Sequence, residues 1–370
     1  MTDTVYQQFG VDNVINAAGK MTALGGTAQS DAVARAQAAA AQSHVDIETL
    51  RRRAGELVAR YTGAQAASIT SGAAAGIAIS VAACITGTHV DRVLRVPNTD
   101  GLRRRVLLQA GHAINFGASV TQMIELGGGR PEIIGWANSV PKALLDAALT
   151  AHADIVAMVY VQSHHSVQEQ MIPLMDCIGA AHRNHVPVIV DAAAEQDLER
   201  YIELGADLVT YSGGKAIGGP TVGFIAGRHD LIEACELQQR GIARAMKVGK
   251  EQIVGLLVAL EHYAHRDPAA DRARQSALVG MMMVRLSGVV GLRIYSKPDE
   301  AGRGIERLAL ERSDGGDIRE LVKHLAAGSP SIRTRNHHLD DGIVLIDPRE
   351  IDEFQVPVIT DRIRKFFESA

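Results

Sequence analysis

Residues 207–220 read Asp-Leu-Val-Thr-Tyr-Ser-Gly-Gly-Lys-Ala-Ile-Gly-Gly-Pro, an apolar stretch that ends in a glycine-rich turn with one lysine, Lys215. The apolar stretch is typical of a buried strand. The glycines let the backbone of the turn approach a ligand closely. The segment therefore predicts a functional lysine at a strand end, facing a cavity.

Three functional interpretations of Lys215 are possible, and two fail on the neighbouring residues. A phosphate-binding P-loop requires glycine where Val209 stands and a hydroxyl where Ala216 stands. Ser212 and Lys215 match the S-x-x-K of penicillin-recognising enzymes, but no S-D-N or K-T-G accompanies them. What remains is a lysine that forms an imine with pyridoxal phosphate (PLP), with Ser212 within reach of the cofactor phosphate. The alternative is a surface lysine in a turn.

An acid that suits PLP follows another predicted strand, one βα unit earlier. Residues 187–193 read Pro-Val-Ile-Val-Asp-Ala-Ala, which places Asp191 at the carboxyl end of a hydrophobic strand. Open α/β sheets bind ligands at that end. A carboxylate beside the pyridine nitrogen keeps that nitrogen protonated, so that the ring accepts electrons. The alternative role for Asp191 is a helix N-cap.

A third segment has the composition of a phosphate site. Residues 68–76 read Ser-Ile-Thr-Ser-Gly-Ala-Ala-Ala-Gly, a strand, a hydroxyl-glycine turn and a helix of small residues. Unpaired amides at a helix start bind anions, so Ser71, Gly72 and Ala73 are predicted to hold the cofactor phosphate. An ordinary helix start is the alternative. The order of phosphate turn, acid and lysine favours PLP more strongly than any single segment does.

Composition limits the class of protein. The 370 residues are 46% hydrophobic with a formal net charge of −4, which excludes a disordered chain and argues against one that mainly neutralises nucleic acid. The three cysteines form no C-x-x-C pair, and no run reaches the roughly 18 apolar residues that span a bilayer. We therefore expect a cytoplasmic protein with no membrane segment.

Apolar runs alternate with helical segments from about residue 47 to 227, which is the signature of βαβ units on a parallel sheet. Strands are predicted at residues 67–70, 106–109, 123–126, 155–161, 188–191, 208–211 and 222–226. Residues 92–109 are interpreted as two short strands around a turn. Long helices and further strands follow, so the chain is divided into residues 1–46, a large domain at 47–250 and an α+β domain at 251–370.

Four stretches resemble the fold-type-I, aspartate aminotransferase-like PLP enzymes, specifically the selenocysteine synthase (L-seryl-tRNA selenium transferase) branch and its shorter D-glucosaminate-6-phosphate ammonia-lyase members. These stretches are residues 14–19, 70–76, 207–219 and 244–250. The resemblance extends from near residue 13 almost to the C-terminus. It implies an N-terminal segment that contributes to the active site, a PLP-binding large domain, catalytic roles for Lys215 and Asp191, and at least a homodimer.

The sequence departs from the branch at its anion-binding residues. The family's L-G-R is Leu24-Gly25-Gly26 here, and its S-R-G-E is Gln-Ala-Gly-His at residues 109–112. Two arginines expected to hold a selenium donor are therefore absent. Arg244 remains, and Lys247 replaces a third arginine. These two are predicted to bind another anion such as a sugar phosphate, or else to form a solvated helix start.

The resemblance also suggests roles for other residues. His112 is predicted to stack on the pyridine ring, and Ser163 or His164 to reach the phenolic oxygen of PLP. Arg335 or Arg349 is expected to bind the substrate carboxylate, a task suited to the bidentate guanidinium. Adjacent histidines do not share a helix face, so no metal site is predicted.

By resemblance, the expected activity is a PLP-dependent lyase that removes water and ammonia from a phosphorylated 2-amino-3-hydroxy sugar acid. D-Glucosaminate 6-phosphate would give 2-keto-3-deoxy-6-phosphogluconate. The alternatives are β-replacement on seryl-tRNA, lyase action on a sulfur or selenium amino acid, and a binding module without catalysis. The family's N-terminal tRNA-binding domain has no counterpart before the first shared motif, so a small-molecule substrate is expected and tRNA is not.

Overall fold

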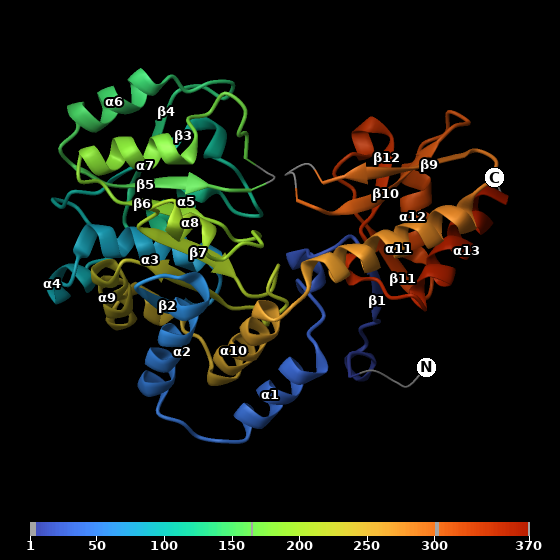
Figure 1. The fold of residues 1–370 in the computed structure, drawn as a ribbon, viewed down its shortest axis with the longest axis horizontal. Helices are drawn as coiled ribbons and strands as arrows, with labels where there is room; N and C mark the ends of the chain where they lie inside the picture. The colour runs from blue at the N-terminus through green and yellow to red at the C-terminus, as the bar shows by residue number, and fades with distance from the viewer. Residues whose placement is uncertain (1–4, 164–165, 300–302, 369–370) are drawn as a thin grey trace. The chain divides into compact units, whose positions relative to one another are not determined.

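The computed structural model describes residues 5–163, 166–299 and 303–368 of the chain (Figure 1). It contains two compact units. Residues 29–265 form the larger unit, while the smaller one combines the N-terminal residues up to 28 with those from 266 onward. The larger unit extends beyond both ends of the predicted range 47–250, because α1 (Asp31–Ala41) packs against α10 (Lys250–Ala264).

The larger unit is built on a seven-stranded sheet with the order β2-β8-β7-β6-β5-β3-β4. Its strands are β2 (Ala66–Thr70), β3 (Arg105–Gln109), β4 (Arg130–Ile134), β5 (Ile155–Val161), β6 (Val188–Asp191), β7 (Leu208–Ser212) and β8 (Gly223–Gly227). Strands β4, β3, β5, β6 and β7 run parallel to one another, whereas β8 runs antiparallel to both of its neighbours, β2 and β7. The predicted mostly parallel α/β sheet is confirmed.

Helices cover both faces of this sheet, as continuous apolar strands require. One face packs against α2 (Ile47–Thr62), α6 (Lys142–Ala151), α7 (Leu174–Arg183), α8 (Arg200–Glu203) and α10. The other face packs against α3 (Ala73–Thr86), α5 (Val120–Leu126) and α9 (His229–Leu237). Figure 1 shows α6 and α7 on one side of the strands and α3 on the opposite side.

The strand predicted at residues 123–126 is wrong, because these residues end helix α5. Ser119 caps that helix by accepting a hydrogen bond from the Gln122 amide, and Val120 and Ile124 are buried on one face four residues apart. A window of four apolar residues is too short to show this helical period.

The predicted pair of strands in residues 92–109 is also wrong. The short helix α4 (Val90–Val93) precedes a loop, and β3 alone follows as a strand. The second neighbour of β3 is β4, which the sequence interpretation missed. Pro131 conceals β4 from a pattern search, since proline is tolerated in a strand mainly at a sheet edge, which is where β4 lies.

The smaller unit is an α+β structure, as predicted for the C-terminal part. Its strands are β9 (Leu292–Pro298), β10 (Glu306–Arg312) and β12 (Ile343–Ile346) in an antiparallel sheet, with β1 (Val14–Ala17) pairing in parallel with β11 (Ser331–Thr334). Its helices are α11 (Pro268–Leu286), α12 (Arg319–Ala327) and α13 (Gln355–Glu368). The β1–β11 pair attaches the N-terminal segment to this unit.

Within the described ranges, no helix has the length and apolar composition needed to cross a membrane. The same ranges contain no group of three or more His, Cys, Asp or Glu side chains arranged to hold a metal ion.

Helix α3 lies unusually close to β7, the strand that leads to the lysine turn. A Cβ atom on Gly76 would be 2.0 Å from Thr210 Oγ1, and that hydroxyl donates a hydrogen bond of 3.3 Å to the carbonyl of Ala73. Only glycine at position 76 permits this approach. The start of α3 is thereby fixed beside the end of β7.

We predict that Gly76→Ala lowers the free energy of unfolding by about 1 to 3 kcal/mol, the usual cost of overpacking a core. Urea unfolding measures this directly. Gly280→Ala is the matched control, because Gly280 lies in α11 with no atom within 4 Å of its added Cβ. That control should be stabilising by about 0.5 to 1 kcal/mol. A Gly76→Ala protein as stable as the parent would contradict the packing argument.

Candidate active site

The segments predicted to be catalytic follow β5, β6 and β7, whose carboxyl ends lie on the same side of the large sheet. The ladder between β5 and β6 pairs Val161 with Asp191, and the ladder between β6 and β7 pairs Asp191 with Thr210. On the other side of β7, strand β8 connects Ser212 with Thr70. Neighbouring strands lie about 4.8 Å apart, so the segments that follow these strand ends form a continuous row.

The start of α3 has the features of an anion site. Gly72, its N-cap, has a φ of +156°, and no atom lies within 4 Å of where a Cβ would be. Thr70 Oγ1 donates a hydrogen bond of 2.9 Å to the Gly72 carbonyl and holds the turn. The first amides of a helix have no partner within the helix, and here the residues of the first turn, Ala73 to Gly76, have side chains too small to cover them. Ser71, Gly72 and Ala73 therefore fit a phosphate group.

The lysine turn is an ordered structure. The Gly213 amide donates to the Val222 carbonyl at 2.7 Å, and the Gly219 amide donates to the Gly213 carbonyl at 2.8 Å. The Gly218 amide donates to the Lys215 carbonyl at 3.2 Å. The Lys215 side chain is half-buried. The turn thus fixes the lysine backbone at the end of β7.

Asp191 is the buried acid of this row. Its side chain is 6% exposed, and its Oδ1 accepts a hydrogen bond of 3.1 Å from the Ala193 amide. Burial raises the pKa of the carboxyl to about 6, while the nearby Lys215 charge lowers it and Glu195 raises it. A buried carboxylate with few hydrogen-bond donors is costly to ionise, so a cation placed next to it is bound favourably. A protonated pyridine nitrogen fits this position, so the residues present suit PLP.

His112 occupies a buried position next to this edge. It ends the 3₁₀ turn η3 (Ala110–His112), and its Nδ1 accepts a hydrogen bond of 3.2 Å from the Val161 amide. The imidazole lies edge-on to Tyr160, with 4.4 Å between ring centroids. Burial lowers the pKa of His112 to about 4, so the ring is neutral at pH 7. Stacking of His112 on the cofactor stays a prediction.

The two residues predicted to contact the phenolic oxygen of PLP, Ser163 and His164, follow β5 in the chain. Ser163 is half-buried, and its carbonyl accepts a hydrogen bond of 2.7 Å from Ser166 Oγ. His164 lies outside the described residues.

Gln109, at the position of the family's S-R-G-E serine, has a structural role here. Its Nε2 donates to the Ile172 carbonyl at 3.1 Å, and its Oε1 accepts from the Ile172 amide at 2.7 Å. The buried Gln109 side chain thus anchors the segment before α7 to the end of β3. From the sequence, only the absence of the family's arginine at the next position, where Ala110 stands, was apparent.

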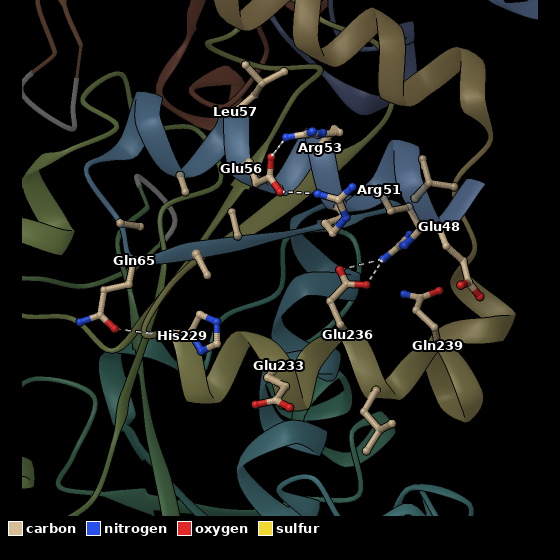
Figure 2. A pocket seen from close by; sticks show the side chains of 18 of the residues that line it. Glu48, Arg51, Arg53, Glu56, Leu57, Gln65, His229, Glu233, Glu236 and Gln239 are labelled. Carbon is tan, nitrogen blue, oxygen red and sulfur yellow. Dashed lines mark hydrogen bonds and ion pairs between the residues drawn. The ribbon is translucent and has the colours of Figure 1, made fainter. Parts of the chain in front are cut away.

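Arg244 and Lys247 line a groove of about 1700 Å³ that does not include the row of strand ends. Figure 2 shows other side chains of this groove, among them Glu48, Glu56 and Gln239. The groove lies between α2 and α9 along the edge of β2. Seven of its lining side chains are Arg or Lys, and four are Glu. None of the predicted cofactor residues belongs to this lining. Both Arg244 and Lys247 are exposed, and Lys215 is not among the residues that line this groove.

Arg51 fixes one wall of the groove, although no sequence motif points to it. Its guanidinium donates to Glu236 at 3.1 Å and to the Ile69 carbonyl at 3.2 Å, which ties α2 to α9 and β2 (Figure 2). Lys250, the last residue of the resembling R-A-x-[RK]-x-x-K segment, also has a structural contact. Its Nζ donates to the carbonyls of Ala40 and Ala41 at 2.7 and 3.2 Å, and so caps the end of α1.

The two candidate carboxylate-binding arginines belong to the smaller unit. Arg349 forms a two-point ion pair with Asp347, at 2.9 and 2.8 Å. Arg335 is 5% exposed and pairs with Leu345 through the backbone. The engagement of Arg349 with Asp347 weighs against it as the substrate ligand, and neither role is tested.

A charge cluster that the sequence interpretation missed holds the N-terminal segment to the smaller unit. Glu350 accepts hydrogen bonds from Thr27 Oγ1 at 3.0 Å and the Ala28 amide at 3.1 Å, and it lies 3.7 Å from Lys20 Nζ. Burial lowers the pKa of Lys20, although Glu350 opposes that shift. Contacts between residues more than 300 positions apart in the chain produce no recognisable pattern in a single sequence.

Comparison with known proteins adds independent findings. The family model described as SelA, L-seryl-tRNA selenium transferase, matches residues 14–289. A D-glucosaminate-6-phosphate ammonia lyase of Salmonella typhimurium is 42% identical over 373 residues, covering 100% of both chains. A 5'-C-glycyluridine monooxygenase-decarboxylase of a Streptomyces species is also 42% identical, over 94% of this chain and 88% of the relative.

Solved structures agree with these relatives. A D-glucosaminate-6-phosphate ammonia-lyase structure superimposes with a TM-score of 0.92 at 42% identity and covers 100% of both chains. The fold alone is shared with a pyridoxamine-pyruvate aminotransferase of Mesorhizobium loti, with a TM-score of 0.57 at 14% identity over 97% of this chain and 93% of the other. The predicted fold class is confirmed.

The raised pKa of Asp191 predicts a specific pH dependence in the cofactor-free protein. Its pKa of about 6 in the folded protein exceeds the ordinary value of 3.8 for an aspartate, so its contribution to stability is fully present below pH 4 and is lost as the pH rises through 6. Asp191→Asn removes this loss. The difference in free energy of unfolding between variant and parent should therefore be about 2 to 3 kcal/mol more favourable to the variant at pH 8 than at pH 4, at 1.36 kcal/mol per pKa unit.

Urea unfolding of parent and variant at pH 4 and pH 8 measures this difference. Asp46→Asn is the control, because Asp46 is an exposed cap of α2 whose pKa is lowered by its hydrogen bonds to Thr49. Its effect should be nearly the same at the two pH values, because the lowered pKa keeps most of the Asp46 carboxyl ionised at pH 4 as well as at pH 8. An Asp191→Asn effect that is equal at both pH values would show that the buried carboxyl is not shifted.

Proposed function

The chain belongs to the L-seryl-tRNA selenium transferase (SelA) family, and from this premise we propose that it is a PLP-dependent ammonia-lyase. Its proposed substrate is a phosphorylated 2-amino-3-hydroxy sugar acid, D-glucosaminate 6-phosphate. The products are 2-keto-3-deoxy-6-phosphogluconate and ammonia. One observation supports this proposal above all: the chain is 42% identical to the ammonia lyase of Salmonella typhimurium over the full length of both proteins.

When bound, PLP supplies an aldehyde that condenses with amines and a protonated ring that accepts the electrons of a broken bond at the α-carbon. Lys215 Nζ would hold the cofactor through its aldehyde and, once released, would take the α-proton of the substrate as general base. Asp191 keeps the ring nitrogen protonated. The amides of Ser71, Gly72 and Ala73, with the Ser212 hydroxyl, bind the cofactor phosphate.

The overall reaction balances without an oxidant. The α-proton and the β-hydroxyl leave the substrate as water, and water is taken up again when the amino nitrogen leaves as ammonia. The carbon skeleton ends as a 2-oxo-3-deoxy acid. Lys215 is the group proposed to move the α-proton, so the reaction requires its amine to be neutral once it is free.

A second candidate activity follows from the Streptomyces relative, which has the same identity. Its printed name describes a glycyl group on the 5' carbon of uridine, and D-glucosaminate likewise carries an amino acid on a sugar-derived chain. A substrate that combines an α-amino acid with a sugar moiety suits both names. The complete mutual coverage of the ammonia lyase, against 94% and 88%, favours the first candidate.

We further propose a cytoplasmic homodimer or higher oligomer with composite sites. Arg244 and Lys247 lie in a groove separate from the cofactor residues, and a second copy would bring them to a site that one chain leaves incomplete. Residues 1–46 and one of Arg335 and Arg349 would complete the substrate site. The family's tRNA substrate is not proposed, because two of its anion-binding arginines are missing and the net charge is −4.

A substrate panel tests the proposed activity. Purified protein with PLP should release ammonia and a 2-oxo acid from D-glucosaminate 6-phosphate, and neither from 5'-C-glycyluridine or seryl-tRNA. Lys215→Ala should lose about 10²- to 10⁴-fold in rate, the usual worth of a general base, whereas Lys142→Ala on α6 should not. Carbon dioxide release with oxygen uptake from 5'-C-glycyluridine would instead establish the second candidate.

Arg244→Ala should raise KM for the phosphorylated substrate by the equivalent of about 1.5 to 3 kcal/mol, the worth of a hydrogen bond to a charged group. The KM for unphosphorylated D-glucosaminate should barely change. Arg240→Ala is the control, because Arg240 lines the same groove without a predicted role. Equal losses for both substrates would assign Arg244 to the structure or to the cofactor.

A further inference from the structure

The segment that follows Asp191 is held by three tyrosine hydroxyls from three different elements. Tyr211, on β7, donates to the carbonyls of Asp197 and Leu198 at 3.1 and 3.3 Å. Tyr263, on α10, donates to the Gln196 carbonyl. Tyr201, on α8, donates to the Glu195 carboxylate at 3.1 Å. Four consecutive residues, 195–198, therefore each accept a tyrosine hydroxyl.

These hydroxyls lie where water competes poorly. Tyr211, Tyr201 and Tyr263 are 1%, 2% and 8% exposed. Burial also raises the pKa of Tyr201 and of Tyr211, so both remain protonated donors at any working pH. Leu198 is itself buried, so its carbonyl would pay the full desolvation penalty if it lost the Tyr211 donor, whereas Gln196 and Asp197 are exposed and their carbonyls are bonded at the surface of the segment.

The other end of the segment is bonded to the strand that carries the lysine. The Ala192 amide donates to the Thr210 carbonyl at 3.0 Å, and the Ser212 amide donates to the Ala193 carbonyl at 3.2 Å. The Ala193 amide in turn donates to Asp191 Oδ1 at 3.1 Å. The orientation of the Asp191 carboxylate therefore depends on where residues 192–198 lie.

Glu195 connects the tyrosines to the electrostatics of the site. Its negative charge acts on Asp191 and contributes to the raised pKa of that carboxyl, in opposition to Lys215. The Tyr201 hydroxyl fixes one of its carboxylate oxygens. A change in the position of Glu195 would alter the potential at Asp191.

We propose that Tyr201, Tyr211 and Tyr263 are positioning residues, a tyrosine clamp that holds residues 192–198 and through them orients the Asp191 carboxylate toward the cofactor's ring nitrogen. This inference rests on the proposed PLP-dependent function. The clamp touches neither cofactor nor substrate. Its effect is to preorganise the acid before the cofactor binds, so that no ordering of the segment opposes binding.

Single Tyr→Phe variants test the clamp, because each removes one hydroxyl and keeps the ring. In the cofactor-free protein, hydrogen exchange of the amides in residues 192–198 should become faster in Tyr211→Phe and Tyr201→Phe. The Kd for PLP should rise about 10-fold, as expected for one buried hydrogen bond. In the loaded enzyme kcat should fall while KM stays within about two-fold, because substrate contacts are untouched.

Tyr295→Phe is the matched control. Tyr295 donates a hydrogen bond of 2.6 Å to Glu311 within the smaller unit, so its variant loses a hydroxyl contact elsewhere. Its PLP Kd, and its exchange at residues 192–198, should equal those of the parent. If Tyr211→Phe fails to fold, Tyr263→Phe, on the more exposed member of the clamp, gives the same readouts.

The outcomes separate the clamp from the function on which it rests. Variants that lose thermal stability but keep the parent's PLP Kd and kcat would make the tyrosines merely structural and overturn the clamp. A parent chain that binds no PLP would overturn the proposed function and the clamp with it. A parent that binds PLP but acts on another substrate would remove the proposed substrate, while the Kd and exchange readouts still decide the clamp.

Discussion

The contact between α3 and β7 is the constraint on which the rest of the site depends. Gly76 lets the helix approach Thr210 so closely that no larger residue fits, and the Thr210 hydroxyl bonds to the first turn of the helix. This approach brings unpaired helix amides next to the strand that carries Lys215. A helix displaced by even one methyl group would move the phosphate site relative to the lysine, and one ligand has to reach both.

The second constraint is electrostatic and concerns Asp191. A carboxylate 6% exposed, with one amide donor, is costly to ionise unless a cation is brought to it. Lys215 supplies part of that charge in the chain itself, but the same lysine has to become a neutral base during the proposed reaction. In the proposed PLP-bound enzyme, a protonated ring nitrogen would resolve this conflict, since it would provide a positive partner for Asp191 that does not depend on the lysine. The acid and the lysine are thus balanced for a bound cofactor.

The sequence predicted the parallel sheet correctly, because its strands are local apolar runs. The lysine, the acid and the phosphate turn are local patterns at the ends of such runs as well, and their roles stay predictions. The sequence interpretation failed where the pattern was short or interrupted: residues 123–126 reveal their helical period only with Val120, and Pro131 conceals the edge strand β4. It also missed Arg51, Glu350 and the tyrosines around residues 195–198. Their roles come from contacts between distant segments, which a single sequence does not record.

The distribution of these residues bears on how related chains differ in reaction. The residues proposed to hold the cofactor follow strands that are fixed by backbone ladders and, for β7, by the contact with α3. Arg244 and Lys247 are instead exposed in an open groove, and Arg335 and Arg349 belong to another unit. Two relatives with different named activities are equally identical to this chain at 42%. Overall identity therefore does not separate the two named activities. The side chains that distinguish them have to be sought where a substrate could be contacted, which directs attention to the exposed groove residues and to the arginines of the smaller unit.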